Sequence, residues 1–217
     1  MKPYQPERCC EPERLDDASP AEARGSLRDL ALLNHWLGGH AILRGLLPAV
    51  SAPFTLLDVG AASGATGAYI EGRFPGSRVT SVDYRHSHLQ TGRGRRVAAD
   101  VFALPFRDRS FDFVLCSMFL HHFSDQQVPE LLVRLHQIST RALLIIEPER
   151  HRLAYRFVPA TRWLFGWDAI TLYDAPVSVQ AGFRTDELRA HARHAGLPQA
   201  VVRAHPPWFR VSLVAPR

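Results

Sequence analysis

An aspartate and three glycines follow one another closely where an apolar run of the sequence ends. Asp58 lies within LLDV, and Gly60, Gly64 and Gly67 follow it. A dinucleotide site spaces its glycines G-x-G-x-x-G, so that backbone amides and a helix N-terminus hold a pyrophosphate. The glycines here lack that spacing, and a carboxylate at the mouth of the loop would repel a phosphate. The loop therefore suits a phosphate-free ligand that carries a cation as well as a carboxylate.

S-adenosylmethionine (SAM) is such a ligand, because it has an α-ammonium, an α-carboxylate and a sulfonium group. At this loop the sequence resembles the class I SAM-dependent methyltransferases, whose first motif is D-x-G-x-G-x-G. Asp58, Gly60 and Gly64 match that motif, whereas Ala62 stands where the family has its middle glycine. We include these four residues in the predicted cofactor site.

The resemblance extends along the next two apolar runs. Asp83 ends RVTSVD, where an acid of the family binds both ribose hydroxyls, and two carboxylate oxygens match a vicinal diol. Asp100 ends VAAD, where the family places an acid or amide against the adenine amino group. We add the neighbours Tyr84 and Val101, and Ser117 at the end of FDFVLCS, to the predicted cofactor-binding residues.

The second half of the chain is similar to small-molecule methyltransferases found beside type III polyketide synthases. The similar segments are Arg150–Tyr155 and Asp174–Val179. The resemblance implies a small, aromatic acceptor, phenolic or quinol-like, and favours O-methylation over C-methylation. A phenol of pKa ~10 is a poor nucleophile until it is deprotonated, so a positioned general base would help.

Four side chains are candidates for that catalytic role. His121 and His122 follow FDFVLCS, and His151 and Asp174 lie in the variable segment beyond the fifth strand. For either of the paired histidines, a structural or substrate-shaping role is an equal alternative. Consecutive residues entering a helix point about 100° apart, so we expect the two rings not to face the same methyl group.

The elements that must position these residues alternate along the chain. Residues 20–47 have helical periodicity, and PAVSAPF is a linker. Five apolar runs then alternate with helical segments, which indicates parallel strands covered on both faces. We predict an α/β fold with a doubly wound, mostly parallel, seven-stranded Rossmann-like sheet, an N-terminal helical arm and a helical cap insertion after strand five.

We predict one methyltransferase domain over residues 1–217. Its parts are the helical arm to about residue 50, the SAM-binding core 51–148, the insertion 149–185, and a closing helix with a C-terminal hairpin at 186–217. The insertion is rich in aromatic residues, which form either ordinary core or an apolar cap over the acceptor.

The composition of the chain bears on its cellular location, its metal content and its alternative functions. The 217 residues are 46% hydrophobic and 22% charged, without a run long enough to span a membrane or a secretory leader, so we expect a cytoplasmic protein without a membrane partner. Cys9, Cys10 and Cys116 have neither disulfide nor zinc spacing, and we expect no metal. A homodimer is left open. The net charge of +5 leaves an RNA methyltransferase as one alternative, and a non-catalytic SAM-binding partner protein is another.

Overall fold

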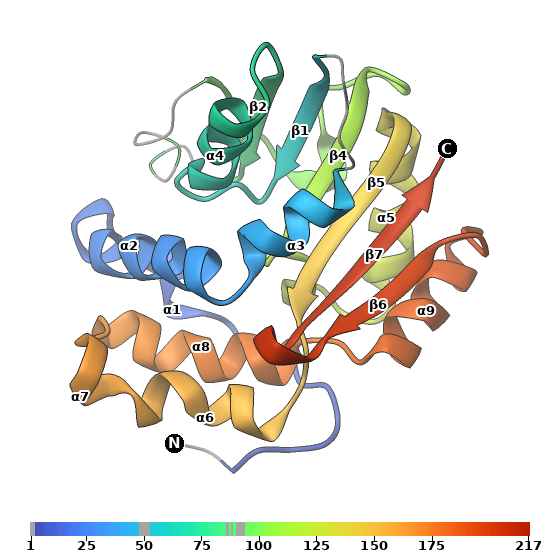
Figure 1. Ribbon diagram of the computed structural model, residues 1–217. Coiled ribbons are helices and arrows are strands. Elements are labelled where there is room, and N and C mark those ends of the chain that lie inside the picture. Colours follow the sequence, from blue (N-terminus) through green and yellow to red (C-terminus); the bar gives the residue numbers. More distant parts are fainter. Residues whose placement is uncertain (1–2, 48–52, 86, 88, 90–93) are drawn as a thin grey trace.

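The computed structural model describes residues 3–47, 53–85, 87, 89 and 94–217, and the elements below belong to these ranges (Figure 1). Residues 48–52 of the predicted linker, and the predicted boundary at residue 50, lie outside the described residues. The strands are β1 (Thr55–Val59), β2 (Arg78–Asp83), β3 (Arg95–Ala98), β4 (Phe111–Ser117), β5 (Ser139–Pro148), β6 (Val201–His205) and β7 (Arg210–Pro216). The helices are α1 (Arg14–Asp17), α2 (Pro20–Trp36), α3 (Gly39–Leu46), α4 (Ala65–Arg73), α5 (Gln127–Ile138), α6 (Arg152–Ala160), α7 (Arg162–Phe165), α8 (Ala169–Ala181) and α9 (Thr185–His194). Three 3₁₀ turns are η2 (Val101–Ala103), η3 (Leu120–His122) and η4 (Pro206–Trp208).

The seven strands form one sheet in the order β3-β2-β1-β4-β5-β7-β6. The first five strands are parallel, and β7 pairs antiparallel with both β5 and β6. The first strand, β1, lies in the middle of the sheet. The next two strands extend the sheet outward to β3, and β4 then pairs with the opposite edge of β1. This is the predicted doubly wound sheet with its closing hairpin, and the predicted fold class is confirmed.

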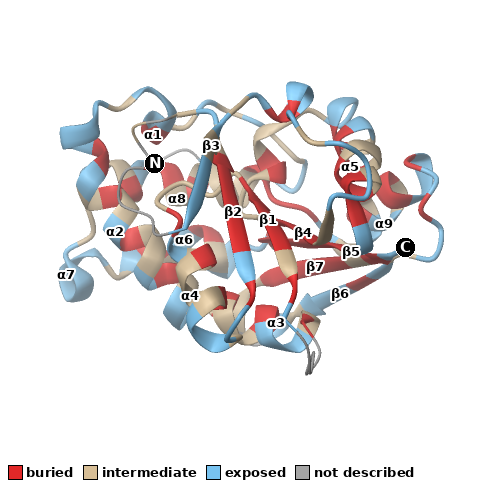
Figure 2. Cartoon of the chain, turned by 90° about the horizontal axis from the view of Figure 1, so that it is seen from above, coloured by how far each residue is buried: buried red, intermediate tan, exposed pale blue. Residues whose placement is uncertain are grey.

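The central strands are apolar on both faces because helices cover both. Leu56 and Leu115 belong to a buried cluster with α3 and α4, and Leu57 and Val114 belong to the opposite cluster with α5 and α9. Figure 2 shows these strands as the buried centre of the molecule. Such continuous burial explains why the runs read as apolar throughout rather than alternating.

The N-terminal arm and the insertion lie together beyond the carboxyl ends of the parallel strands (Figure 1). Helix α2 begins at a capping box, in which Ser19 and Glu22 satisfy each other's backbone N–H groups, with Pro20 in the first turn. It packs on α8, and α8 packs on α6. These helices therefore form a layer across the sheet edge where ligands of open α/β sheets bind.

The aromatic residues of the insertion divide between the two predicted roles. Tyr155 and Phe183 are buried as ordinary core, and Phe157 lines the cavity described below. Trp163 and Phe165, in contrast, are exposed. The insertion is thus part core, part cavity wall and part surface.

Candidate functional site

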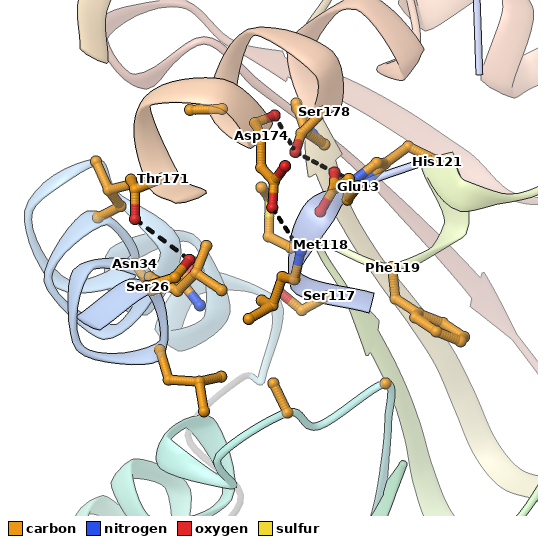
Figure 3. Close-up of a pocket in the computed structure, with 18 of the residues that line it drawn as sticks. Glu13, Ser26, Asn34, Ser117, Met118, Phe119, His121, Thr171, Asp174 and Ser178 are labelled. Atoms are coloured by element: carbon orange, nitrogen blue, oxygen red, sulfur yellow. Dashed lines mark hydrogen bonds and ion pairs between the residues drawn. The ribbon is translucent and has the colours of Figure 1, made fainter. Parts of the chain in front are cut away.

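A cavity of about 470 Å³ lies between the carboxyl ends of β1, β2 and β4 and the helices α2, α6 and α8 (Figure 3). The N-terminal segment, residues 3–19, contributes a further wall through Glu13, Leu15 and Asp16. Among the predicted site residues, those lining the cavity are Asp58, Gly60, Ala62, Asp83, Tyr84, Ser117, His121, His122 and Asp174. Gly64, Asp100, Val101 and His151 are outside that set.

The glycine loop needs its glycine at position 60. Gly60 has a φ of +69°, and a Cβ built there would lie 2.2 Å from the ring of Phe119. Ala62 also has a left-handed φ, of +45°, although it carries a side chain. Its N–H donates to Asp83 Oδ2 at 2.8 Å. The family's middle glycine therefore falls at a position with left-handed backbone, and here an alanine adopts the same conformation.

Asp58 is buried beneath this loop with one oxygen unsatisfied. Its side chain is 2% exposed, and Oδ2 has no hydrogen-bond partner among the described residues. Burial raises its pKa to about 7, the charge of Asp83 adds to the rise, and a backbone hydrogen bond from Gly67 opposes it. A buried carboxylate oxygen at a cavity wall is a fitting partner for an ammonium group.

Asp83 and Asp100 have different surroundings. Asp83 lines the cavity, and its Oδ1 accepts from the N–H of Arg85 at 2.9 Å. Its carboxylate is thus oriented at the cavity wall by backbone N–H groups, and its two coplanar oxygens match the spacing of a vicinal diol. Asp100 is exposed, and its Oδ1 accepts from the N–H of Phe102 at 2.9 Å, which caps η2. The adenine role of Asp100 and the cofactor contact of the buried Val101 stay predictions.

His121, which follows β4, also lines the cavity and lies between two carboxylates. Its side chain is 2% exposed, its Nδ1 lies 2.6 Å from Glu147 Oε2, and its Nε2 lies 3.3 Å from Glu13 Oε1. Burial alone would lower its pKa, but the charges of Glu147 and Glu13 prevail and raise the pKa to about 9. Glu147 is fully buried, and its Oε1 accepts from the N–H groups of Phe119 and Leu120. His121 is therefore fixed in orientation at both ring nitrogens.

The ring of His122 does not point away from the ring of His121, contrary to our expectation. Both lie in the 3₁₀ turn η3, and their rings stack with centroids 4.6 Å apart. His122 Nε2 lies 3.9 Å from Glu13 Oε2, and its Nδ1 lies 3.5 Å from Asp16 Oδ2. The shared carboxylate of Glu13 thus draws both rings to one side. Ligand atoms of Glu13, His121 and His122 lie within 4.8 Å of one another, a donor set that could also hold a divalent cation.

Known proteins resemble the chain in sequence over part of its length and in structure over most of it. Residues 57–140, less than half of the chain, match the family model described as a methyltransferase domain. That segment is therefore similar to a methyltransferase domain. No curated protein sequence matches the chain.

Three solved structures show how far the likeness extends. Human N-acetylserotonin methyltransferase in complex with SAM has a TM-score of 0.67 and 18% identity, covering 92% of this chain and 56% of the human chain. A protein from Nostoc punctiforme proposed to be an O-methyltransferase has a TM-score of 0.64 and 17% identity, covering 88% and 58%. The plantazolicin methyltransferase in complex with S-adenosylhomocysteine has a TM-score of 0.68 and 12% identity, covering 90% of each chain. The chain thus spans little more than half of the first two proteins, and at these identities the likeness establishes the fold.

SAM is the cofactor of the methyltransferase domain, and the residues present fit it. The unsatisfied oxygen of Asp58 suits the α-ammonium, and Asp83 suits the ribose diol. The N-terminus of α4, which begins at Ala65 after the left-handed Gly64, is a favourable place for the α-carboxylate.

The two other candidate bases have structural partners. Both carboxylate oxygens of Asp174 accept from the N–H groups of Arg14 and Leu15, at 2.8 and 3.0 Å, so Asp174 fixes the start of α1. Burial raises the pKa of Asp174 to about 6, against the effect of those bonds. His151 accepts from the N–H of Leu153 as the N-cap of α6 and stacks on Phe209. Neither arrangement resembles the paired contacts of His121.

Sequence analysis missed three residues of the site. Glu147 is the penultimate residue of β5, and Asp83 is the last residue of β2, so an acid near the carboxyl end of a strand was a usable signal. Glu13 reaches His121 from 108 residues away, and nothing local marks it. Arg210 starts β7, is 4% exposed and lines the cavity. Burial lowers the pKa of Arg210 to about 10, with the charge of Glu147 opposing the shift.

Proposed function

We propose that the protein transfers the methyl group of SAM to a hydroxyl oxygen of a small aromatic acceptor, phenolic or quinol-like. The observation that carries this proposal is the buried His121, which is held by Glu147 behind it and lines the same cavity as the unsatisfied carboxylate of Asp58. A base and a cofactor-binding acid that line one cavity are what methylation of a weakly acidic hydroxyl requires.

SAM, when bound, supplies the electrophilic methyl group. Asp58 binds the ammonium of the cofactor and Asp83 its ribose, which fixes the direction in which the methyl group can be attacked. Bound there, the cofactor would supply a methyl group to the acceptor oxygen, whose hydroxyl proton must then leave. His121 takes the hydroxyl proton at Nε2.

Glu147 is the positioning residue in this scheme. Its Oε2 accepts the Nδ1–H of His121, so it selects the ring tautomer that leaves Nε2 free as a base and stabilises the imidazolium once the proton arrives. Glu13 lies at the same Nε2 in the structure, so an acceptor hydroxyl must share or replace that contact. We assign Asp174 and His151 structural roles, because their polar atoms already hold α1 and α6.

The acceptor class follows from the walls of the cavity. Helices α2 and α6 contribute mainly apolar side chains, among them Leu30, Leu33, Leu37, Phe157 and Val158. Such walls suit a flat, apolar ring better than a charged polymer. Two structural relatives are named after N-acetylserotonin and plantazolicin, and neither name points to RNA.

A panel assay with methyl-labelled SAM tests the proposal. We expect label in at least one phenol or quinol and none in RNA. His121→Gln should lower kcat/KM by about 10²–10⁴, the usual contribution of a general base. The dissociation constant for SAM, measured by calorimetry, should stay within about twofold.

Two controls separate the alternatives. The His122→Gln variant should keep most of the activity, because His121 is the base. A chelator should leave the rate unchanged, because no metal bound at Glu13, His121 and His122 is needed to activate the acceptor. Full activity of the His121→Gln variant would overturn the role of the base. Label only in RNA, or SAM binding without transfer to any acceptor, would overturn the proposed function.

A further inference from the structure

Helix α7 and the outer side of α6 expose a concentrated apolar surface. Trp163, Leu164 and Phe165 are consecutive residues of α7, with exposed fractions of 86%, 76% and 53%. Leu153 of α6 is 63% exposed. None of the four residues of α7 is buried. Three consecutive large apolar side chains kept in water on α7, with a fourth at the start of α6, indicate a surface that binds something outside the chain.

The position of α7 supports this interpretation. It lies at the outer end of the layer formed by α6 and α8, away from the sheet (Figure 1), and Figure 2 shows it at the edge of the molecule. Its turn is held by bonds that do not use the exposed side chains: the Nε1–H of Trp167 donates to Thr161 Oγ1 at 3.0 Å, and Gly166 closes the helix with a φ of +61°. Of the exposed side chains, Phe165 also packs beside Trp167, with ring centroids 5.0 Å apart, whereas Trp163 and Leu164 take no part in these hydrogen bonds.

The charged side chains of α6 and α7 have one sign. The stretch 151–167, which Arg150 and Asp168 flank, contains no aspartate or glutamate, and its arginines Arg152, Arg156 and Arg162 are exposed. The guanidinium of Arg162 lies 4.6 Å from the centre of the Trp163 ring. We call these arginines, together with the four apolar residues above, the α6–α7 surface. An apolar centre surrounded by arginines is the composition of protein surfaces that lie in the headgroup region of anionic bilayers.

The inner side of the same helix closes the reaction cavity. Ala154, Phe157 and Val158 of α6 line the cavity, whereas Leu153 and Arg156 face outward as exposed residues. A partner bound to the outer side of α6 would thus sit one helix away from the acceptor site. That arrangement suits an acceptor drawn from a lipid phase.

We propose that the α6–α7 surface docks the protein on an anionic lipid bilayer, with the apolar side chains inserted between headgroups and the arginines paired with lipid phosphates. Among the described residues no helix could cross a membrane, so the contact is with the bilayer surface only. The inference goes beyond the proposed reaction and changes our expectation that the protein has no membrane partner. A second copy of the chain fits less well, because a two-fold contact would bring six arginines together without an acid of this segment to pair with them.

Vesicle flotation tests the docking directly. The wild-type protein should float with phosphatidylcholine vesicles containing about 30% phosphatidylglycerol, and less with phosphatidylcholine alone, because each arginine contributes roughly a fivefold preference for the anionic surface. The W163S/F165S variant should lose at least about tenfold in partitioning, because it removes two inserting aromatic side chains. Trp36→Ser is the matched control, since Trp36 of α2 is also exposed but lies outside the α6–α7 surface, and it should bind as the wild type does.

A second readout does not depend on a disruptive variant. Brominated phosphatidylglycerol vesicles should quench part of the wild-type tryptophan fluorescence, and Trp163→Phe should keep the flotation while losing that part. Absence of wild-type flotation with anionic vesicles, or equal flotation of W163S/F165S, would overturn the proposal. A wild-type dimer that W163S/F165S converts to a monomer in light scattering would assign the surface to self-association instead. Because none of these readouts uses methyl transfer, the docking and the proposed function can fail separately.

Discussion

At the scale of single residues, the site combines positions whose chemistry is local with positions that depend on distant partners. The Asp58 loop is local: Asp58, Gly60, Ala62 and Gly64 lie within seven residues, so the loop could be compared with the family's first motif, and Asp83 and Asp100 supported the cofactor that this resemblance implies. The base site is not local, because His121 acquires its properties from Glu147 and Glu13, at sequence separations of 26 and 108. Sequence could therefore nominate His121 but could not distinguish it from His122 or His151.

Ala62 gives the first prediction. A non-glycine residue in the left-handed region costs roughly 1–2 kcal/mol, and Ala62 has a φ of +45°. Ala62→Gly should therefore raise the free energy of unfolding by about 1 kcal/mol, or the Tm by about 2–4 °C for a chain of this size. Ala68→Gly, in the middle of α4, is the control and should lower stability by a similar amount. A lower Tm for Ala62→Gly in thermal unfolding would show that the loop is not strained at this position.

Glu13 gives the second prediction. Its carboxylate helps to raise the pKa of His121 to about 9, so at neutral pH the ring of the free protein is mainly protonated and cannot act as a base. The rate should then increase with pH until His121 loses its proton. Glu13→Gln removes one negative charge and should move the acidic limb of the kcat/KM profile to lower pH. Asp16→Asn, which changes a carboxylate near His122 only, should move it less.

An unchanged profile in the Glu13→Gln variant would mean that Glu13 has no influence on the base. A shift to higher pH would contradict the sign of the electrostatic argument, since removal of a carboxylate destabilises the imidazolium.

At the scale of elements, the sheet was predictable because its signals are periodic and contiguous. The strands β1 and β4 are short, mainly buried apolar runs, β2 ends in Asp83, and α5 has amphipathic spacing. The N-terminal segment has no such signal. Its course is set by contacts to residues more than 100 positions away, among them the hydrogen bonds from Arg8 to Ala181 and His121. Those contacts are properties of the folded chain only.

Arg8 gives the prediction for this element. Its side chain is 6% exposed, and its guanidinium donates to the carbonyl oxygens of Ala181, His121 and Phe123 and pairs with Asp125. Arg8→Ala should cost about 2–3 kcal/mol of unfolding free energy, because it leaves buried carbonyl groups without a charged donor. Trypsin should also cut the N-terminal segment faster. Arg24→Ala, on the exposed side of α2, should change stability by less than about 0.5 kcal/mol in the same urea titration.

Wild-type stability and an unchanged cleavage rate in the Arg8→Ala variant would show that the N-terminal segment is held by other contacts, such as those of Asp174 with α1.

At the scale of the whole molecule, the cavity is assembled from every part of the chain. The core contributes Asp58 and His121, the N-terminal segment Glu13, the insertion Asp174, and the closing hairpin Arg210. Charged groups from these parts meet in a small buried volume, so their protonation is linked to folding. Any group whose pKa differs between the folded and unfolded chain makes the stability of the whole protein depend on pH.

His121 dominates this linkage in the alkaline range. Its folded pKa is about 9 and its ordinary value 6.5, so the folded chain holds a proton that the unfolded chain has released. This stabilisation is fully present below pH 6.5 and is lost as the pH rises through 9. From the two pKa values, its loss between pH 7.5 and 9.5 amounts to about 2 kcal/mol. Burial also raises the pKa values of Cys10 and Cys116, which adds a decline of the same sign.

The unfolding free energy of the protein without SAM should therefore fall between pH 7.5 and 9.5, and His121→Asn should flatten that fall by about 2 kcal/mol because the titrating ring is gone. Urea titrations of both proteins across this range measure the difference in slope, which is independent of any uniform loss of stability in the variant. His136→Asn is the control, since His136 bonds to the carbonyl oxygen of Pro216 and lies far from both carboxylates of the site. Parallel pH curves for the wild type and His121→Asn would mean that Glu13 and Glu147 do not hold a proton on His121. The base would then already be neutral at physiological pH, and the rate would not rise toward pH 9.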